Sequence, residues 1–312
     1  MFVTKPINSN KKNIKSPLNY IGGKYKLLNQ ITPLFPNNIN TFVDLFAGGC
    51  NVGININSNK VIFNDNLTYL IELFTVFKND DIKSIICHIE NRIDEFQLSQ
   101  INEIGYKEFR DFYNKTKLPL DLFVLIAFSF NHQIRFNNSH QFNNPFGKNR
   151  SSFNNNMKSN LINFISKLQN GNFNFSNQSF EKFDFFQLSK DDFVYCDPPY
   201  LITTGSYNDG KRGFKGWTEK EEIELLNILD NLDKQNIKFA LSNVIEHKGK
   251  ENCLLKDWLS KNRAYTLRYL NKDYSNSNYQ TKDRDKKASV EVLITNYKLP
   301  KIQNEQPSLF DL

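Results

Sequence analysis

The sequence contains few cysteines and histidines and no long apolar run. Its 312 residues include four cysteines and four histidines; the cysteines form no CxxC pair, and the histidines are scattered. This distribution argues against a clustered zinc-type metal site and favours reduced thiols, as in the cytoplasm. No run of about eighteen apolar residues occurs, so we expect no membrane-spanning segment. Residues 1–16 lack an apolar core and therefore do not predict a signal peptide.

Length and charge limit the architecture more than the function. The chain suits one large domain or a core with one inserted lobe, and its 39% hydrophobic residues can fill a substantial core. Lysine and arginine number 40 against 33 aspartates and glutamates, which gives a net charge of +7. This basic excess fits a polyanionic partner, although many unrelated proteins share it.

Short apolar runs bounded by Asn or Gly predict buried strands in the first and last thirds of the chain. These runs are 41–45, 60–63, 192–196, 238–241, 265–270 and 290–295. Helical spacing lies between the later runs, at 219–232 and 251–259. The alternation of strands and helices predicts an α/β fold with an open, mostly parallel sheet.

The middle third of the chain interrupts this alternation. Helix-like spacing over 82–96 and 118–130 is followed by a polar stretch, 131–156, that is rich in Asn, Phe and basic residues. We therefore expect a discontinuous core formed by residues 1–75 and 166–300. An inserted, mainly helical lobe then occupies 76–165, and 301–312 form a flexible tail.

Two predicted strands end in residues suited to binding a ligand. The first runs into the segment 44–49 (DLFAGG), whose glycines allow a ligand to approach the backbone at the carboxyl edge of the sheet. A plain tight turn explains these glycines equally well. Asp65 ends the second strand, where a carboxylate accepts hydrogen bonds from ribose hydroxyls or caps the helix that begins near Leu67. The lack of a GxGxxG pattern disfavours a dinucleotide site.

The most specific motif is Asp197-Pro198-Pro199-Tyr200, which follows the apolar run 192–196. Proline cannot continue a strand, so the chain turns rigidly at this point. The turn fixes the Asp197 carboxylate and the Pro198 carbonyl beside an aromatic ring. Such a site can accept both hydrogens of a planar amino group and stack the base that carries it.

A further segment, 17–24, precedes the first strand and ends in Gly22-Gly23-Lys24. A flexible Gly-Gly followed by lysine can wrap around a ligand that carries a carboxylate, with Lys24 as the opposite charge. The start of a helix is the alternative interpretation.

In their order along the chain, these segments resemble the Dam-like family of DNA adenine-N6 methyltransferases, from Ser16 to about Leu299. The resemblance implies a Rossmann-like methyltransferase sheet, S-adenosyl-L-methionine as the cofactor, and methylation of an adenine that is flipped out of double-stranded DNA. It assigns cofactor binding to Tyr20, Gly22, Gly23, Lys24, Asp44, Phe46, Gly48, Asp65, Phe180 and Asp197. It assigns catalysis to Asp197, Pro198, Pro199 and Tyr200, without a metal. Ser179 departs from the family, in which many members have Asp before the phenylalanine.

The predicted lobe carries a second match, because 135–137 (RFN) and 142–148 (FNNPFGK) are similar to the DNA-reading hairpin of the family. By this resemblance, Arg135, Asn137, Pro145 and Lys148 contact DNA. A solvated loop is the alternative. Four residues that follow the DPPY motif are predicted to form a mobile loop that closes over the flipped base: Lys211, Arg212, Lys215 and Trp217.

Three other functions remain open: cytosine-N4 methylation, methylation of a protein amide, and DNA binding without catalysis. An SPPY motif is typical of the first and an NPPY motif of the second, and Asp197 disfavours the third. The segment from Gln306 to Leu312 (QPSLFDL) resembles peptides that dock on the bacterial replication sliding clamp. The alternative is that Leu309 and Phe310 pack on the core of this protein.

Overall fold

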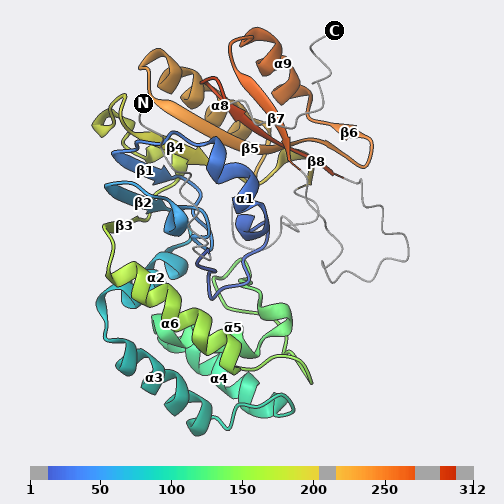
Figure 1. Ribbon diagram of the computed structural model, residues 1–312. Coiled ribbons are helices and arrows are strands. Elements are labelled where there is room, and N and C mark those ends of the chain that lie inside the picture. Colours follow the sequence, from blue (N-terminus) through green and yellow to red (C-terminus); the bar gives the residue numbers. More distant parts are fainter. Residues whose placement is uncertain (1–12, 204–215, 271–288, 300–312) are drawn as a thin grey trace.

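The computed structural model describes residues 13–203, 216–270 and 289–299, which form a twisted sheet with helices on both faces (Figure 1). The strand order is β3-β2-β1-β4-β5-β8-β7, and the short β6 pairs with β5. The strands are β1 (Thr41–Asp44), β2 (Lys60–Asn64), β3 (Phe173–Ser176), β4 (Phe193–Cys196), β5 (Lys238–His247), β6 (Lys250–Glu251), β7 (Thr266–Leu270) and β8 (Ser289–Thr295).

The sheet is parallel from β3 to β5, whereas β8 and β7 are antiparallel to their neighbours. The predicted open, mostly parallel sheet is therefore confirmed, as are all six predicted strands. The sequence analysis missed β3, which is short and alternates Phe with polar residues. It also ended β5 six residues early, because residues 242–247 are held in the strand by pairing with β8.

Alternation along the central strands divides the core between the two faces of the sheet. Phe42 and Phe193 point to one face and Val43 and Val194 to the other, as the period of two in a strand requires. The first face is covered by α1 (Leu28–Ile31) and by the helices that follow β2. The second face is covered by α8 (Glu219–Lys234) and α9 (Cys253–Lys261) (Figure 1).

The middle of the chain forms a group of helices beside the first face of the sheet (Figure 1). They are α2 (Thr68–Asn79), α3 (Ile82–Glu95), α4 (Glu103–Thr116), α5 (Pro119–Phe128) and α6 (Asn155–Gln169). From Asp121 to Phe128, every residue of α5 is buried; α2, α3 and α4 pack against it, and α6 packs against α2 and α3. The division predicted at 75/76 falls inside α2 and that at 165/166 inside α6.

Short 3-10 helices complete the described chain: η1 (Lys24–Leu27), η2 (Thr32–Leu34), η3 (Gly53–Asn55), η4 (Phe130–His132), η5 (Phe180–Lys182), η6 (Phe185–Gln187) and η7 (Leu201–Thr203). In the part of the chain that the structure describes, no helix is long and apolar enough to span a membrane. The predicted clamp-docking segment, 306–312, lies outside the described residues, as do Lys211, Arg212 and Lys215.

Candidate active site

Three predicted site carboxylates lie at the carboxyl ends of adjacent parallel strands. Asp44 ends β1, Asp65 follows β2 and Asp197 follows β4. Because β1 pairs with both β2 and β4 in parallel register, the three residues gather at one edge of the sheet. Open α/β sheets bind their ligands at this edge.

Tyr20 lies over the glycine turn that follows β1. Gly48 has φ +47°, and a Cβ atom on it would lie 2.9 Å from the ring of Tyr20. A Cβ atom on Gly49 would lie 3.1 Å from Tyr20 Cβ. The glycines therefore serve close packing of the turn against this aromatic ring, in addition to a tight change of direction. The structure thus brings together Tyr20 and Gly48, which are 28 positions apart in the sequence.

Replacing Gly48 by alanine should weaken cofactor binding by about tenfold, because the strained φ costs about 1–2 kcal/mol and the new methyl group displaces Tyr20. Equilibrium dialysis with S-adenosylmethionine, the cofactor that the sequence resemblance implies, measures the effect. Gly249→Ala is the matched control, since Gly249 has φ +76° but no atom within 4 Å of the added Cβ. Equal loss of affinity in both variants would contradict the role given to Tyr20 packing.

Asp65 organises the turn between β2 and α2. Its Oδ2 accepts a hydrogen bond from the backbone N–H of Gly48 at 2.9 Å, and its Oδ1 accepts one from Leu67 at 2.9 Å. The N-cap position of α2 belongs to Leu67, so Asp65 does not fill it. Burial raises the pKa of Asp65, and the backbone N–H groups oppose that shift. Each carboxylate oxygen accepts more than one hydrogen bond, so both can also bind hydroxyl groups.

Asp44 is buried and accepts a hydrogen bond from the backbone N–H of Gly53 at 3.0 Å. Burial raises the pKa of Asp44 to about 7, although this hydrogen bond lowers it and the nearby carboxylates of Asp197 and Asp65 raise it further. Its charge is therefore sensitive to any ligand that enters the edge of the sheet.

Asp197 belongs to a largely buried ionic cluster, which we call the Lys24 cluster. Its members are Lys24, Asp197, Glu291 and Tyr200. The Lys24 ammonium lies 2.7 Å from Asp197 Oδ1 and 3.2 Å from Glu291 Oε1. It also donates to the Gly22 carbonyl at 3.1 Å. The Tyr200 hydroxyl lies 2.9 Å from both Asp197 Oδ1 and Glu291 Oε1, and Lys24 Nζ lies 5.0 Å from the centre of the Tyr200 ring.

The electrostatics of the Lys24 cluster follow from burial. Burial by itself lowers the pKa of Lys24, but the two carboxylates outweigh it and raise the pKa above its ordinary value. Burial raises the pKa of Asp197, and the charge of Lys24 opposes that shift. The sequence predicted that Lys24 neutralises the carboxylate of the cofactor, and this stays a prediction. In the structure, its ammonium faces Asp197 and Glu291.

Three aromatic rings lie beside the glycine turn. Phe46 and Phe180 have ring centres 5.4 Å apart, and Trp217 lies 5.6 Å from Phe46 and 5.3 Å from Phe180. Trp217 is buried, and its indole N–H donates to Glu222 at 2.6 Å. The prediction that Trp217 belongs to a mobile loop over the flipped base is therefore wrong, because its ring is packed in the core on the second face of the sheet.

The predicted DNA-contacting residues lie in the loop 129–148, which is closed by isolated antiparallel bridges between Ser129 and Phe146 and between Phe136 and Phe142. Arg135 is half-buried, and its Nε atom has no hydrogen-bond partner among the described residues. Asn137 Oδ1 accepts from the backbone N–H groups at 139 and 141, at 3.0 and 2.9 Å, and so shapes the tip of the loop.

The base of this loop is fixed to the rest of the protein. Pro145 and Lys148 are exposed, and the Pro145 carbonyl accepts from the backbone N–H of Phe130 at 2.7 Å. Asn19 Nδ2 donates to the Asn131 carbonyl at 2.9 Å. This last bond joins the loop to the segment that carries Tyr20 and Lys24.

Sequence analysis missed several buried carboxylates, two of which contact residues named in the sequence predictions. Glu291 is 1% exposed and Glu222 is fully buried. Glu222 accepts from Trp217 and, through Oε1, from Asn243 and Asn252 at 3.0 Å each. The sequence did contain a signal for Glu291, which interrupts the apolar run 290–295. An acidic residue in such a strand is buried only when it is paired, so its presence predicts a partner of opposite charge or a hydrogen-bond donor. No comparable signal marks Glu222 in the acidic first turn of α8.

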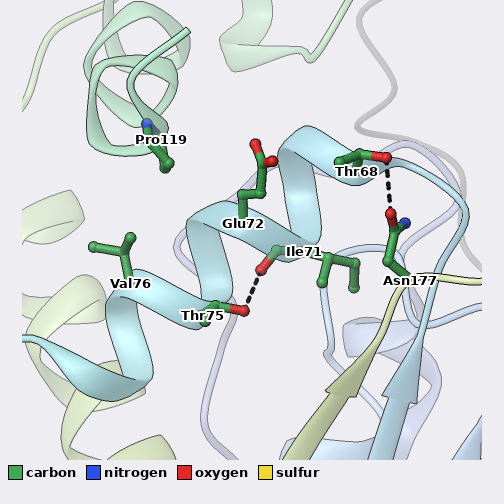
Figure 2. A pocket seen from close by; sticks show the side chains of 7 residues that line it. All are labelled: Thr68, Ile71, Glu72, Thr75, Val76, Pro119 and Asn177. Carbon is green, nitrogen blue, oxygen red and sulfur yellow. Dashed lines mark hydrogen bonds between the residues drawn. The ribbon is translucent and has the colours of Figure 1, made fainter.

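A groove on the outer side of α2 contains none of the predicted site residues (Figure 2). It is lined by Thr68, Ile71, Glu72, Thr75, Val76, Pro119 and Asn177. At one end, the Thr68 hydroxyl donates to Asn177 Oδ1 at 2.8 Å (Figure 2). The groove lacks buried charge and aromatic rings, so we place the chemistry at the edge of the sheet instead.

Comparisons with known proteins point to one family. The family model for D12 class N6 adenine-specific DNA methyltransferases matches residues 20–276. Modification methylase StsI of Streptococcus sanguinis is 56% identical over 300 residues, which cover 95% of this chain and 45% of StsI. Type II methyltransferase M.FokI of Planomicrobium okeanokoites is 54% identical over 305 residues, which cover 95% of this chain and 46% of M.FokI.

A DNA adenine methylase of Escherichia coli strain K12 is 25% identical over 264 residues, which cover 83% of this chain and 88% of that protein. The chain thus spans somewhat less than half the length of StsI and M.FokI. The matched range, 20–276, spans the segment before β1, the turn after β1 and the DPPY motif. The chain belongs to the D12 class of N6 adenine-specific DNA methyltransferases, whose methyl donor is S-adenosylmethionine.

Proposed function

We propose that this chain methylates the N6 amino group of an adenine, flipped out of duplex DNA at a specific sequence, with S-adenosylmethionine as methyl donor. The observation that carries the proposal is Asp197, a partly buried acceptor at the carboxyl end of β4, held by Lys24 and Tyr200 through one oxygen. The names of StsI and M.FokI favour a role in restriction–modification. Because the substrate is DNA, we propose that the enzyme acts in the cytoplasm of a prokaryotic cell or a phage-infected host.

The residues at the edge of the sheet fit the cofactor. Asp65 offers carboxylate oxygens for ribose hydroxyls, and Phe46 and Phe180 offer apolar ring surface for an adenine. The close packing at Gly48 leaves no room for a side chain where the backbone would approach the ligand. When bound, the cofactor supplies an electrophilic methyl group on a sulfonium.

Asp197 and the Pro198 carbonyl act on the nucleophile. The lone pair of the adenine amino nitrogen is delocalised into the ring, so the nitrogen is a weak nucleophile. By accepting its two N–H groups, these oxygens increase the electron density on nitrogen and hold it in line with the methyl group. Asp197 is also placed to take the proton that the nitrogen loses when the new C–N bond forms.

Tyr200 supports the extruded base. Its hydroxyl is fixed by two carboxylates, so the position of its ring is set before the base arrives. Stacking on such a ring offsets about 1–3 kcal/mol of the cost of removing the base from the duplex.

We propose that residues 76–165 form the target-recognition lobe and that the loop 129–148 contacts the duplex through Arg135, Asn137, Pro145 and Lys148. The buried Nε of Arg135, which has no partner among the described residues, supports this, since a half-buried guanidinium is costly unless a ligand completes its hydrogen bonds. The hydrogen bond from Asn19 to Asn131 would couple the position of this loop on the DNA to the position of the segment that carries Lys24.

Arg135→Ala should reduce the preference for cognate over non-cognate DNA by about 1–3 kcal/mol, because arginine reads guanine edges in the major groove. Binding measured on both DNAs, at several salt concentrations, tests this. Arg263→Ala is the control, since Arg263 is an exposed arginine after α9. Weaker cofactor binding with unchanged specificity would show that Arg135 does not read DNA.

The segment from Gln306 to Leu312 is also proposed to dock on a replication sliding clamp, with Leu309 and Phe310 as apolar anchors and an affinity in the micromolar range. Fluorescence titration of this peptide against purified clamp tests the idea. Binding that persists in Phe310→Ala, or no saturation up to about 100 µM, would refute it.

A further inference from the structure

Glu291 is a buried charge on a central strand. It is 1% exposed in β8, where it pairs with Val244 of β5 and Leu270 of β7. Burying a carboxylate among such residues is strongly unfavourable unless cations and hydrogen-bond donors compensate it. The structure supplies both, through Lys24 at 3.2 Å and the Tyr200 hydroxyl at 2.9 Å.

The same two donors serve Asp197. The Lys24 ammonium has three N–H bonds, and its three acceptors are Gly22, Asp197 and Glu291. The Tyr200 hydroxyl carries a single proton, yet lies 2.9 Å from an oxygen of each carboxylate. One lysine charge is therefore divided between two carboxylates, and one hydroxyl proton is shared between them.

This sharing has a consequence for Asp197. Both of its side-chain contacts in the cluster end on Oδ1, and its side chain is 17% exposed. Among the described residues, none donates a hydrogen bond to Oδ2, which leaves that oxygen as the acceptor for an incoming amino group. If Lys24 paired with Asp197 alone, its full charge would withdraw electron density from the carboxylate and weaken it as an acceptor.

We propose that Glu291 is a positioning residue for methyl transfer, which divides the charge of Lys24 and the proton of Tyr200 so that Asp197 is held by Oδ1 and remains a strong acceptor. The inference rests on the proposed function, because it concerns the same acceptor. Glu291 acts through Lys24 and Tyr200 and needs no contact with the base. A buried apolar residue at this position would hold neither donor.

The sign of the electrostatic effect is fixed by the geometry. The titratable groups that face Glu291 from the described elements are Lys24 of η1, Tyr195 of β4, and Asp197 and Tyr200 after β4. The negative charge of Glu291 raises the pKa of Asp197, whereas the hydrogen bond from Tyr200 lowers it. Removing the charge of Glu291 should therefore lower the pKa of Asp197, and removing the Tyr200 hydroxyl should raise it.

The experiment compares the full-length wild-type chain with Glu291→Gln and Tyr200→Phe. In Glu291→Gln, the single-turnover methylation rate should fall by about tenfold, and the acid limb of its pH profile should move to lower pH. The affinities for cofactor and for DNA should stay within about twofold of the wild-type values. The ¹³C resonance of the Asp197 carboxyl, followed in the apoprotein, should titrate at lower pH in Glu291→Gln and at higher pH in Tyr200→Phe.

Glu246→Gln is the matched control, since Glu246 is an exposed carboxylate that pairs with Val290, next to Glu291. It should leave the rate and the titration unchanged. A lower rate in Glu291→Gln with an unshifted Asp197 titration would overturn the proposal and leave Glu291 a structural residue. If the wild-type chain methylated no DNA, the proposed function would fail, and the apoprotein titration would still decide whether Glu291 tunes Asp197.

Discussion

Replacing Asp197 by alanine should lower the rate of DNA methylation by at least about a hundredfold to a thousandfold, because the preorganised acceptor of the amino group is lost. DNA affinity should change little, since Asp197 contacts no phosphate in the proposed complex. Single-turnover methylation with labelled S-adenosylmethionine, together with DNA binding by anisotropy, measures the two quantities separately.

Asp191→Ala is the matched control for this prediction. Asp191 is an exposed carboxylate just before β4, on the same stretch of chain but at the opposite end of the strand. It should keep wild-type activity. If Asp197→Ala kept more than about a few per cent of wild-type turnover, the loss would be too small for a catalytic acceptor. Asp197 would then have no direct role in methyl transfer.

Replacing Lys24 by methionine should lower the free energy of unfolding by about 3–5 kcal/mol near neutral pH, because the buried Glu291 and the partly buried Asp197 lose their common cation. Activity should be lost as well, since Asp197 is then held only by Tyr200. Urea unfolding measures the stability. Lys26→Met is the control, because Lys26 is exposed two residues later in η1 and is paired with no carboxylate among the described residues.

The loss of stability in Lys24→Met should depend on pH with a defined sign. Without Lys24, the pKa of Asp197 in the folded state rises further above its unfolded value. The folded state then binds more protons than the unfolded state, so stability decreases as pH rises through the folded pKa of Asp197. The defect should be smaller near about pH 5 than near about pH 8. Adding Glu291→Gln should restore part of the stability, and no restoration would contradict the shared-charge description.

The sequence determined the class of fold and most of the motifs at the edge of the sheet. Strands such as β1 and β4 are short apolar runs ended by Asp-Leu-Phe or by Asp followed by two prolines, and these local signals do not depend on the rest of the chain. Parallel order then places Asp44, Asp65 and Asp197 at one edge, because equivalent ends of parallel strands coincide.

Only the tertiary structure decided how these residues are used. Lys24 faces Asp197 and Glu291 because η1, β4 and β8, which lie far apart in the sequence, meet in the Lys24 cluster. Glu222 on α8 is buried where Asn243 of β5 and Asn252 before α9 donate to its carboxylate. Spacing along a chain carries no information on such pairings, since a buried charge is located by partners from distant segments rather than by its neighbours.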